Sequence, residues 1–541
     1  MIVAAQPEAA EEGALVLQRG GNAIDAAVTA AFVQCVVDPL MAGIAGYGTL
    51  LNFDAAKGTT TSIEFYSRAP SCVTADMWAD QIVGQTQDGY AFVVKDNVNE
   101  VGYQSVGTLG TLAGLAHALE RYGTLTLAEA MAPAIRYARE GFRMRPHMYY
   151  YCALERARDG MKETQDRLRL TATGRKVFFH ADGRLKQPGD LIVNTDLAQT
   201  LQQIAERGAR DFYEGEIAER IVADMAAHQG FVRAQDLRDF QVDEVEPVAG
   251  RFRGLEVLGI PAPGGGLQLI QTLQILDHFD LKALGHNSPE YLRVLAEALK
   301  WSTVDKDLFV GDPRFVEVPT AQLLSAAHAQ ALAARIQAGE KASVSRRVAT
   351  RPPEPKDTTQ LCVIDANGNA VSLTHTLGTC SGVITEGLGF MYNGLMSGFD
   401  PQPGSPASIA PGKSRTSSQS PAMLLRNGQP VIVLGAPGGT AICSALCQVI
   451  LNMEIFGMSP TEAVSAPRIS VTSDAIDVSN RIPRYITREL EAMGYRVNRS
   501  HLGFAFAAPH LIARDENGSL RGGADPQRDG VALAVQLKDG A

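Results

Sequence analysis

The chain changes character at a polar, proline-rich segment, SRRVATRPPEPKD, which spans residues 345–357. Most patterns before it are helical, whereas most patterns after it alternate apolar and polar residues as strands do. Its three prolines and its lack of periodicity predict an exposed connector. Because helices and strands are both plentiful but do not alternate strictly, the sequence favours stacked layers of sheet and helix over a Rossmann fold.

The part before the connector is expected to contain several amphipathic helices and two strands. Helical patterns cover residues 8–36, with an interruption at Gly20-Gly21-Asn22, then 105–145 in two pieces, 196–228 and 288–309, and a helix is expected after the glycine-rich turn at 261–266. Residues 43–53 are expected to form a glycine-rich loop that enters a strand, and residues 59–66 the next strand.

The part after the connector is expected to be rich in strands. Two alternating runs flank Asn367-Gly368, which is a typical hairpin turn sequence. Further strand patterns cover residues 422–436 and 531–537, and a helical pattern covers 440–456.

Composition excludes some classes of partner. The chain has 541 residues, a net charge of -10 and no basic cluster, which argues against nucleic acid and against an anionic membrane surface. No apolar run reaches the length of a membrane span, and the first residues lack the features of a signal peptide. At roughly 150 residues per domain, the length fits several domains or one large layered unit.

The seven cysteines have no zinc-binding spacing. Cys443 and Cys447 lie one helical turn apart in an apolar run, which predicts buried free thiols. We therefore expect a reducing compartment, the cytoplasm, and neither a metal nor another cofactor.

Thr358 opens the first strand after the connector and is a candidate nucleophile. A threonine hydroxyl needs a base beside it, and its own α-amino group can be that base. The reference pKa of such an amine is about 7.7–8.0, so it is partly neutral near neutral pH. Such an amine requires a cut between Asp357 and Thr358. The alternative is that Thr358 merely begins a strand after a connector.

Two further segments carry groups that could bind an anion. The turn GAPGGT at 435–440 follows a strand pattern and precedes a helix, so the N–H groups of Gly438 and Gly439 could receive an oxyanion or a phosphate. It lacks the lysine of a nucleotide-binding P-loop. In SRTSSQSP at 414–421, the hydroxyls of Ser417 and Ser418 could donate to a carboxylate. The alternatives are a tight turn and an ordinary loop.

Taken together, these segments resemble one family. DTTQLCVIDANGNAVSLTHT, RTSSQSP and GAPGGT, in this order, resemble the small subunit of γ-glutamyltransferases. VAAQPEAAEEGALVLQRGGNAIDAAV and the later GGADPQRDG also resemble the family, so that the match covers essentially the whole chain.

The resemblance implies an N-terminal nucleophile (Ntn) hydrolase, an α+β protein with a four-layer αββα sandwich. Such a chain cuts itself, here between Asp357 and Thr358, into a large subunit of residues 1–357 and a small subunit of residues 358–541. The resemblance assigns roles to Thr358 as nucleophile, Thr376 as its orienting partner, Gly438 and Gly439 as oxyanion donors, and Ser417 and Ser418 as substrate-carboxylate contacts.

The sequence departs from the family where transferases bind the amino acid end of glutamate. Tyr66 occupies the place of an arginine, Leu395 that of a glutamine and Gly398 that of an aspartate. A buried substrate ammonium without an acceptor or an anion costs several kcal/mol. We therefore expect a substrate without an α-amino group, whose carboxylate is held by residues drawn from Ser417, Ser418, Tyr66, Arg68 and Arg415.

This pattern resembles the amidohydrolase branch of the family, which includes oxamate amidohydrolase and cephalosporin acylases. The expected activity is hydrolysis of a small carboxylate-bearing amide such as oxamate. The alternatives are γ-glutamyl transfer or glutathione hydrolysis, a cephalosporin-acylase-like activity, and an inert, unprocessed relative. The expected partners are a small-molecule substrate and the two subunits of one precursor, with a possible dimer of processed units.

Overall fold

Two antiparallel sheets organise the part of the chain that the computed structural model describes, residues 1–86, 91–155, 162–346 and 357–536. The first sheet has the strand order β20-β1-β11-β12-β2-β3-β8. Its strands are, in this order, Val531–Leu533, Ile2–Ala4, Thr359–Ile364, Ala370–Thr376, Tyr47–Asp54, Thr59–Phe65 and Asp243–Val245. The second sheet has the order β19-β18-β14-β13-β10-β9. Its strands are Leu520–Ala524, His510–Arg514, Gln429–Gly435, Ala422–Arg426, Leu255–Gly259 and Val248–Phe252.

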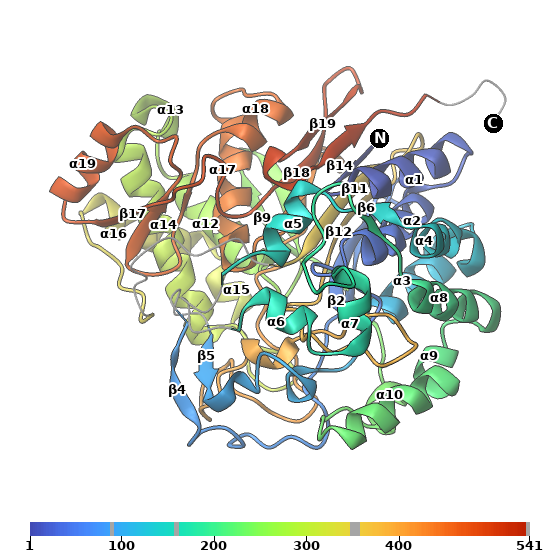
Figure 1. Cartoon of the computed structure of the whole chain (residues 1–541). Coiled ribbons are helices and arrows are strands. Elements are labelled where there is room, and N and C mark those ends of the chain that lie inside the picture. Colours follow the sequence, from blue (N-terminus) through green and yellow to red (C-terminus); the bar gives the residue numbers. More distant parts are fainter. Residues whose placement is uncertain (87–90, 156–161, 347–356, 537–541) are drawn as a thin grey trace.

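Helices cover the outer face of each sheet (Figure 1). On the first sheet they are α1 (Pro7–Gln18), α2 (Ala23–Val37), α3 (Thr111–Tyr122) and α4 (Leu127–Glu140). On the second they are α12 (Gly266–Leu276), α14 (Pro289–Phe309), α16 (Ala326–Gln337) and α17 (Ile442–Glu454). Every residue of α2 is buried, as expected of a helix that is apolar on all sides.

The two sheets contact each other directly along their inner faces. Ser372 on β12 donates a hydrogen bond to the carbonyl of Leu434 on β14, 2.8 Å away. Gly435 ends β14 against β11, where a Cβ atom would overlap the side chain of Gln360. The layer order is therefore helix, sheet, sheet, helix, and the αββα sandwich expected from the resemblance is confirmed.

The remaining elements surround this sandwich (Figure 1). The helices are α5 (Pro146–Cys152), α6 (Thr164–Leu168), α7 (Ala172–Phe178), α8 (Thr195–Arg207), α9 (Asp211–Glu214), α10 (Glu216–Ala227), α11 (Ala234–Arg238), α13 (Leu281–Leu284), α15 (Thr320–Leu323), α18 (Pro460–Ser465) and α19 (Arg484–Ala492). The small sheets are β4 (Ile82–Gln85) with β5 (Phe92–Val94), β6 (Phe142–Arg143) with β7 (Leu191–Ile192), and β15 (Ile469–Ser470) with β16 (Ala475–Val478) and β17 (Arg496–Arg499).

Most of the predicted elements are present. The interrupted helix at 8–36 is α1 and α2, and the predicted hairpin around Gly368 is β11 and β12. One boundary differs: the helix predicted at 440–456 starts with a single 3-10 turn, Gly439–Ala441, and the α-helix α17 begins only at Ile442. The expected connector falls largely on residues 347–356, outside the described residues. Among the described helices, none is long and apolar enough to cross a membrane.

Candidate active site

Thr358 and Thr376 lie together at one end of the β11–β12 hairpin. Thr359 pairs with His375 across the hairpin, which brings Thr358 next to the last residue of β12. The hydroxyl of Thr358 donates to the hydroxyl oxygen of Thr376 at 3.0 Å, and both residues are buried. The N–H of Gly378 donates to the same oxygen at 2.8 Å. The structure thus joins the predicted nucleophile to its predicted orienting partner.

The backbone of Thr358 is strained. Its φ is +137°, which is a rare conformation for a β-branched residue. Such a conformation costs about 1–3 kcal/mol and persists where surrounding contacts impose it. The buried guanidinium of Arg528 supplies one such contact, a 3.0 Å hydrogen bond to the carbonyl of Thr358, and donates a second bond to the Tyr151 hydroxyl.

The side chains beside the nucleophile point to the opposite face of the sheet, because successive strand residues alternate. The hydroxyl of Thr359 is bonded to the side-chain amides of Gln6 and Gln34, at 3.0 Å from each. His375 shares a 2.9 Å hydrogen bond with Gln34. Burial lowers the pKa of His375 to about 3, so its ring is neutral. His375 therefore supports the strand and does not face Thr358.

The predicted anion-binding glycines lie where β14 leads toward α17. Gly438 and Gly439 have φ values of +144° and +56°, which favour glycine. A Cβ atom on Gly438 would overlap the backbone of Ala507, and the N–H of Ala508 donates to the carbonyl of Pro437 at 2.9 Å. Gly438 precedes and Gly439 opens the 3-10 turn before α17, and backbone N–H groups at the start of a helix have no helical acceptor.

The predicted serine pair is joined to the glycine-rich turn at 261–266. The N–H of Ser417 donates to the carbonyl of Pro263 at 2.8 Å, and the N–H of Gly265 donates to the carbonyl of Gln419 at 2.8 Å. The hydroxyl of Tyr66 lies against the same turn, 2.7 Å from the position of a Cβ atom on Gly264. Burial raises the pKa of Tyr66 well above its usual value, so its hydroxyl stays protonated and can donate.

Lys306 is a residue that the sequence analysis missed. Its buried ammonium donates to the hydroxyl of Ser418 at 2.9 Å. The positive charge of Lys306 also acts on Cys443, in the first turn of α17, where it opposes the rise in pKa that burial causes. The sequence did indicate that Lys306 is buried, since it follows Leu295 and Leu299 at helical spacing on the buried face of α14.

The two candidate arginines have different surroundings. Arg68 forms a 2.8 Å ion pair with Asp243 on β8. Arg415 lies against Gly398, where a Cβ atom would overlap its guanidinium, and its Cζ is 5.6 Å from the ring centre of Tyr47. Tyr47 pairs with Thr376 in the sheet, so of these two candidates Arg415 lies beside a direct neighbour of Thr376.

Residues 395–398, where the sequence departs from the family, are apolar at one end and lie against a cation at the other. Leu395 is fully buried, and a Cβ atom on Gly107 would overlap its side chain. Gly398, three residues later, leaves the space that Arg415 occupies. Within the described ranges, no group of three or more His, Cys, Asp or Glu side chains could hold a metal ion.

Comparison with known proteins agrees with this geometry. Residues 9–535 match the family described as gamma-glutamyltranspeptidase. The chain is 36% identical to the acylase ACY 1 proenzyme of Pseudomonas sp. (strain V22), over 99% of this chain and 93% of the relative. It is 31% identical to the glutathione hydrolase proenzyme of Escherichia coli (strain K12), over 97% and 90%. The crystal structure of cephalosporin acylase from Bacillus halodurans superposes with a TM-score of 0.85 at 28% identity, over 99% and 96%. The chain therefore belongs to the gamma-glutamyltranspeptidase family.

Proposed function

We propose that the protein is a self-processed amidohydrolase that cleaves small amides bearing a carboxylate and no α-amino group, with oxamate as the smallest example. The observation that carries the proposal is the Thr358–Thr376 hydroxyl pair with Arg415 nearby, in the space beside Gly398. The chain belongs to a family of autoprocessed Ntn hydrolases, and its relatives act on amide bonds.

Processing begins at the bond between Asp357 and Thr358. The Thr358 hydroxyl oxygen attacks the carbonyl carbon of Asp357, the C–N bond breaks, and the hydroxyl proton passes to the released nitrogen. Water then hydrolyses the resulting ester and leaves a carboxylate on Asp357 and a free amine on Thr358. The strained φ of Thr358 favours this step, because cleavage releases the strain. The products are subunits of residues 1–357 and 358–541.

The freed amine then makes Thr358 an effective nucleophile. The hydroxyl attacks the amide carbon of the substrate while the amine accepts its proton and passes it to the leaving nitrogen. An ester on Thr358 remains, and water hydrolyses it to release the acid. In this scheme Thr376 holds the nucleophile in position. The N–H groups of Gly438 and Gly439 stabilise the oxyanion, and loss of one such donor in other enzymes lowers kcat by about 10²–10³-fold.

Charge selects the substrate in this proposal. A substrate ammonium would lie between the apolar side chain of Leu395 and the guanidinium of Arg415. It would find no acceptor at Leu395 and a like charge at Arg415, so its binding would be unfavourable. A carboxylate would meet Arg415 and the hydroxyls of Ser417 and Ser418, with Lys306 behind Ser418. Tyr66 adds a donor at the glycine-rich turn.

A second candidate function is removal of a larger acyl group that ends in a carboxylate. The observation that favours it is the 36% identity to an acylase proenzyme over 99% of the chain. Both candidates require the same nucleophile and the same preference for an anion, and they differ in the size of the acyl group.

A matched pair of substrates tests the charge preference. Glutaryl-p-nitroanilide and γ-glutamyl-p-nitroanilide differ only by the α-amino group, and the purified protein should release colour faster from the glutaryl compound. Ammonia release from oxamate, measured in parallel, decides between the small and the larger acyl group. A faster reaction with the γ-glutamyl compound would contradict the charge preference.

Mass spectrometry of the same preparation tests the processing step. Two fragments that end at Asp357 and begin at Thr358 are expected, and Thr358→Ala should remain one chain without activity. A wild-type protein that stays uncut and inactive would support the inert alternative, and a fully active Thr358→Ala variant would overturn the mechanism.

A further inference from the structure

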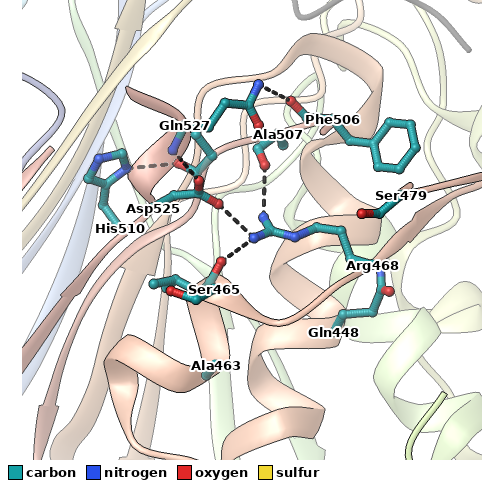
Figure 2. A network of polar contacts seen from close by, with 12 residues as sticks. Gln448, Ala463, Ser465, Arg468, Ser479, Phe506, Ala507, His510, Asp525 and Gln527 are labelled. Carbon is teal, nitrogen blue, oxygen red and sulfur yellow. Dashed lines mark hydrogen bonds and ion pairs between the residues drawn. The ribbon is translucent and has the colours of Figure 1, made fainter. Parts of the chain in front are cut away.

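Arg468 and Asp525 form a buried ion pair (Figure 2). Arg468 follows α18, and Asp525 follows β19. One terminal nitrogen of the Arg468 guanidinium donates to an Asp525 carboxylate oxygen at 2.6 Å and also to the carbonyl of Val464. The other donates to the carbonyl of Ala507 at 2.8 Å. Arg468 therefore ties three separate segments together.

The Ala507 end of this network reaches the glycines proposed to bind the oxyanion. Ala507 contacts Gly438 backbone to backbone, and Ala508 is bonded to the carbonyl of Pro437. Phe506 has a φ of +76°, a conformation that a non-glycine residue keeps only where contacts impose it. Those contacts include the Gln527 side-chain amide, which donates to the carbonyl of Phe506 at 3.3 Å (Figure 2).

His510 also fixes the segment 506–508. Its Nδ1 atom lies 2.8 Å from the carbonyl of Ala508. Burial lowers the pKa of His510 to about 3, so the ring is neutral and Nδ1 carries the hydrogen that this bond requires. Hydrogen bonds from Arg468, Gln527 and His510 therefore hold segment 506–508 in place where it contacts Gly438.

The Asp525 end of the network reaches the nucleophile. The second oxygen of the Asp525 carboxylate accepts the N–H of Gln527 at 2.8 Å and so caps the short turn Pro526–Arg528. That turn presents Arg528, whose guanidinium donates to the carbonyl of Thr358. One carboxylate therefore connects, through two arginines, the segment beside Gly438 with the residue proposed to attack.

We propose that the Arg468–Asp525 pair is a positioning device, which sets the distance between the oxyanion-binding glycines and the Thr358 hydroxyl. The inference rests on the proposed function, because it assumes that Gly438 and Thr358 act on the same substrate carbonyl. A buried ion pair contributes little net stability compared with apolar packing, so positioning is the physical reason for keeping this one. A displacement of about 1 Å at a catalytic centre can lower the rate by about 100-fold.

The test variant is Arg468→Lys. Lysine keeps the positive charge but cannot bridge Asp525, Ala507 and Val464 at once, because it lacks the planar fork of arginine. We expect kcat for the amide substrate to fall by about 100-fold with little change in KM, since the carboxylate contacts lie elsewhere. Rates are divided by the fraction of chains cut at Thr358, measured by mass spectrometry, so that slower maturation is not counted as slower catalysis.

Arg167→Lys is the matched control. Arg167 is also buried, forms an ion pair with Glu100, and donates to the carbonyls of Cys380 and Lys162. These partners include neither the segment beside Gly438 nor Thr358. We expect this variant to lose thermal stability to a similar extent as Arg468→Lys while kcat stays close to that of the wild type.

The following outcomes decide the inference. It is overturned if folded, processed Arg468→Lys keeps the wild-type kcat, or if Arg167→Lys loses as much. If Arg468→Lys does not fold, Gln527→Leu removes only the bond to Phe506 and should still lower kcat selectively; an unchanged kcat there overturns the inference. If the wild type shows no Thr358-dependent hydrolysis, the proposed function fails instead. In that case a crystal structure of Arg468→Lys or Gln527→Leu tests the positioning inference alone. A shift of Gly438 relative to Thr358 supports the inference, and an unchanged distance overturns it.

Discussion

At the residue scale, two arginines that look equivalent in the sequence have different surroundings. Arg68 forms an ion pair with Asp243, and Arg415 lies beside Tyr47 and Gly398. A hydrogen bond to a charged group is worth about 1.5–3 kcal/mol, so the arginine that binds the substrate carboxylate should dominate kcat/KM.

We predict that Arg415→Leu lowers kcat/KM for a carboxylate-bearing amide by about 10–100-fold. Arg68→Leu is the comparison variant and should cost less, because the Arg68 guanidinium is held by Asp243 on β8. Steady-state kinetics on both variants measures this difference. Equal losses would show that the carboxylate is not bound as proposed.

Lys306 allows a second prediction at this scale. Lys306→Met removes the ammonium bonded to Ser418 and leaves a serine hydroxyl without its cation. We expect KM for the carboxylate substrate to rise by about tenfold, the cost of one charge-assisted hydrogen bond. Lys306→Arg should retain part of the affinity, because the charge remains. A Lys306→Met variant with the wild-type KM would show that Lys306 does not contribute to substrate binding.

At the element scale, strand β3 carries a buried carboxyl group that costs stability. Glu64 lies opposite Asp243 of β8, and burial followed by repulsion from Asp243 raises the pKa of Glu64 to about 8. The folded chain therefore binds a proton that the unfolded chain has already released above about pH 4.3. The free energy of unfolding falls as pH rises from about 4.3 to 8, because the native state holds more protons in this range.

We predict that Glu64→Gln flattens this pH dependence and stabilises the protein at pH 8.5 by a few kcal/mol relative to its effect at pH 5. Urea unfolding at the two pH values measures the difference. Glu340→Gln, at an exposed position, should keep the wild-type slope. The prediction is wrong if Glu64→Gln and Glu340→Gln give the same slope.

At the scale of the whole molecule, the expected cut does not separate two independent units. In the first sheet, β11, β12 and β20 follow residue 357, whereas β1, β2, β3 and β8 precede it. The second sheet combines β9 and β10 from before the cut with β13, β14, β18 and β19 from after it. Both sheets and the core between them therefore depend on both products.

We predict that the two processed subunits stay associated under native conditions. Size-exclusion chromatography should give one peak that contains both fragments, and denaturing gels should resolve them. They should separate only in the denaturant range in which the tertiary structure unfolds. Recovery of either fragment alone as a folded protein would contradict the interleaved sheets.

Much of this protein was readable from its sequence, because the signals involved are local. Apolar periodicity, the interruption at Gly20-Gly21-Asn22 and the turn at Gly368 mark where helices and strands begin and end. Thr358, the candidate nucleophile, and Thr376 are also close in sequence, since they flank one hairpin, but the role of Thr376 was expected only from the resemblance. The order of the four layers, however, was expected only from the resemblance to a family.

Only the tertiary structure decided how distant residues meet. Lys306 reaches Ser418 across 112 positions, and Arg468 reaches Asp525 across 57. It also decided that Arg415 lies against Tyr47, which pairs with Thr376, whereas Arg68 pairs with Asp243. Periodicity can place a residue on a buried face, but the partner across that face is set by the packing of sheets and helices, which no local pattern specifies.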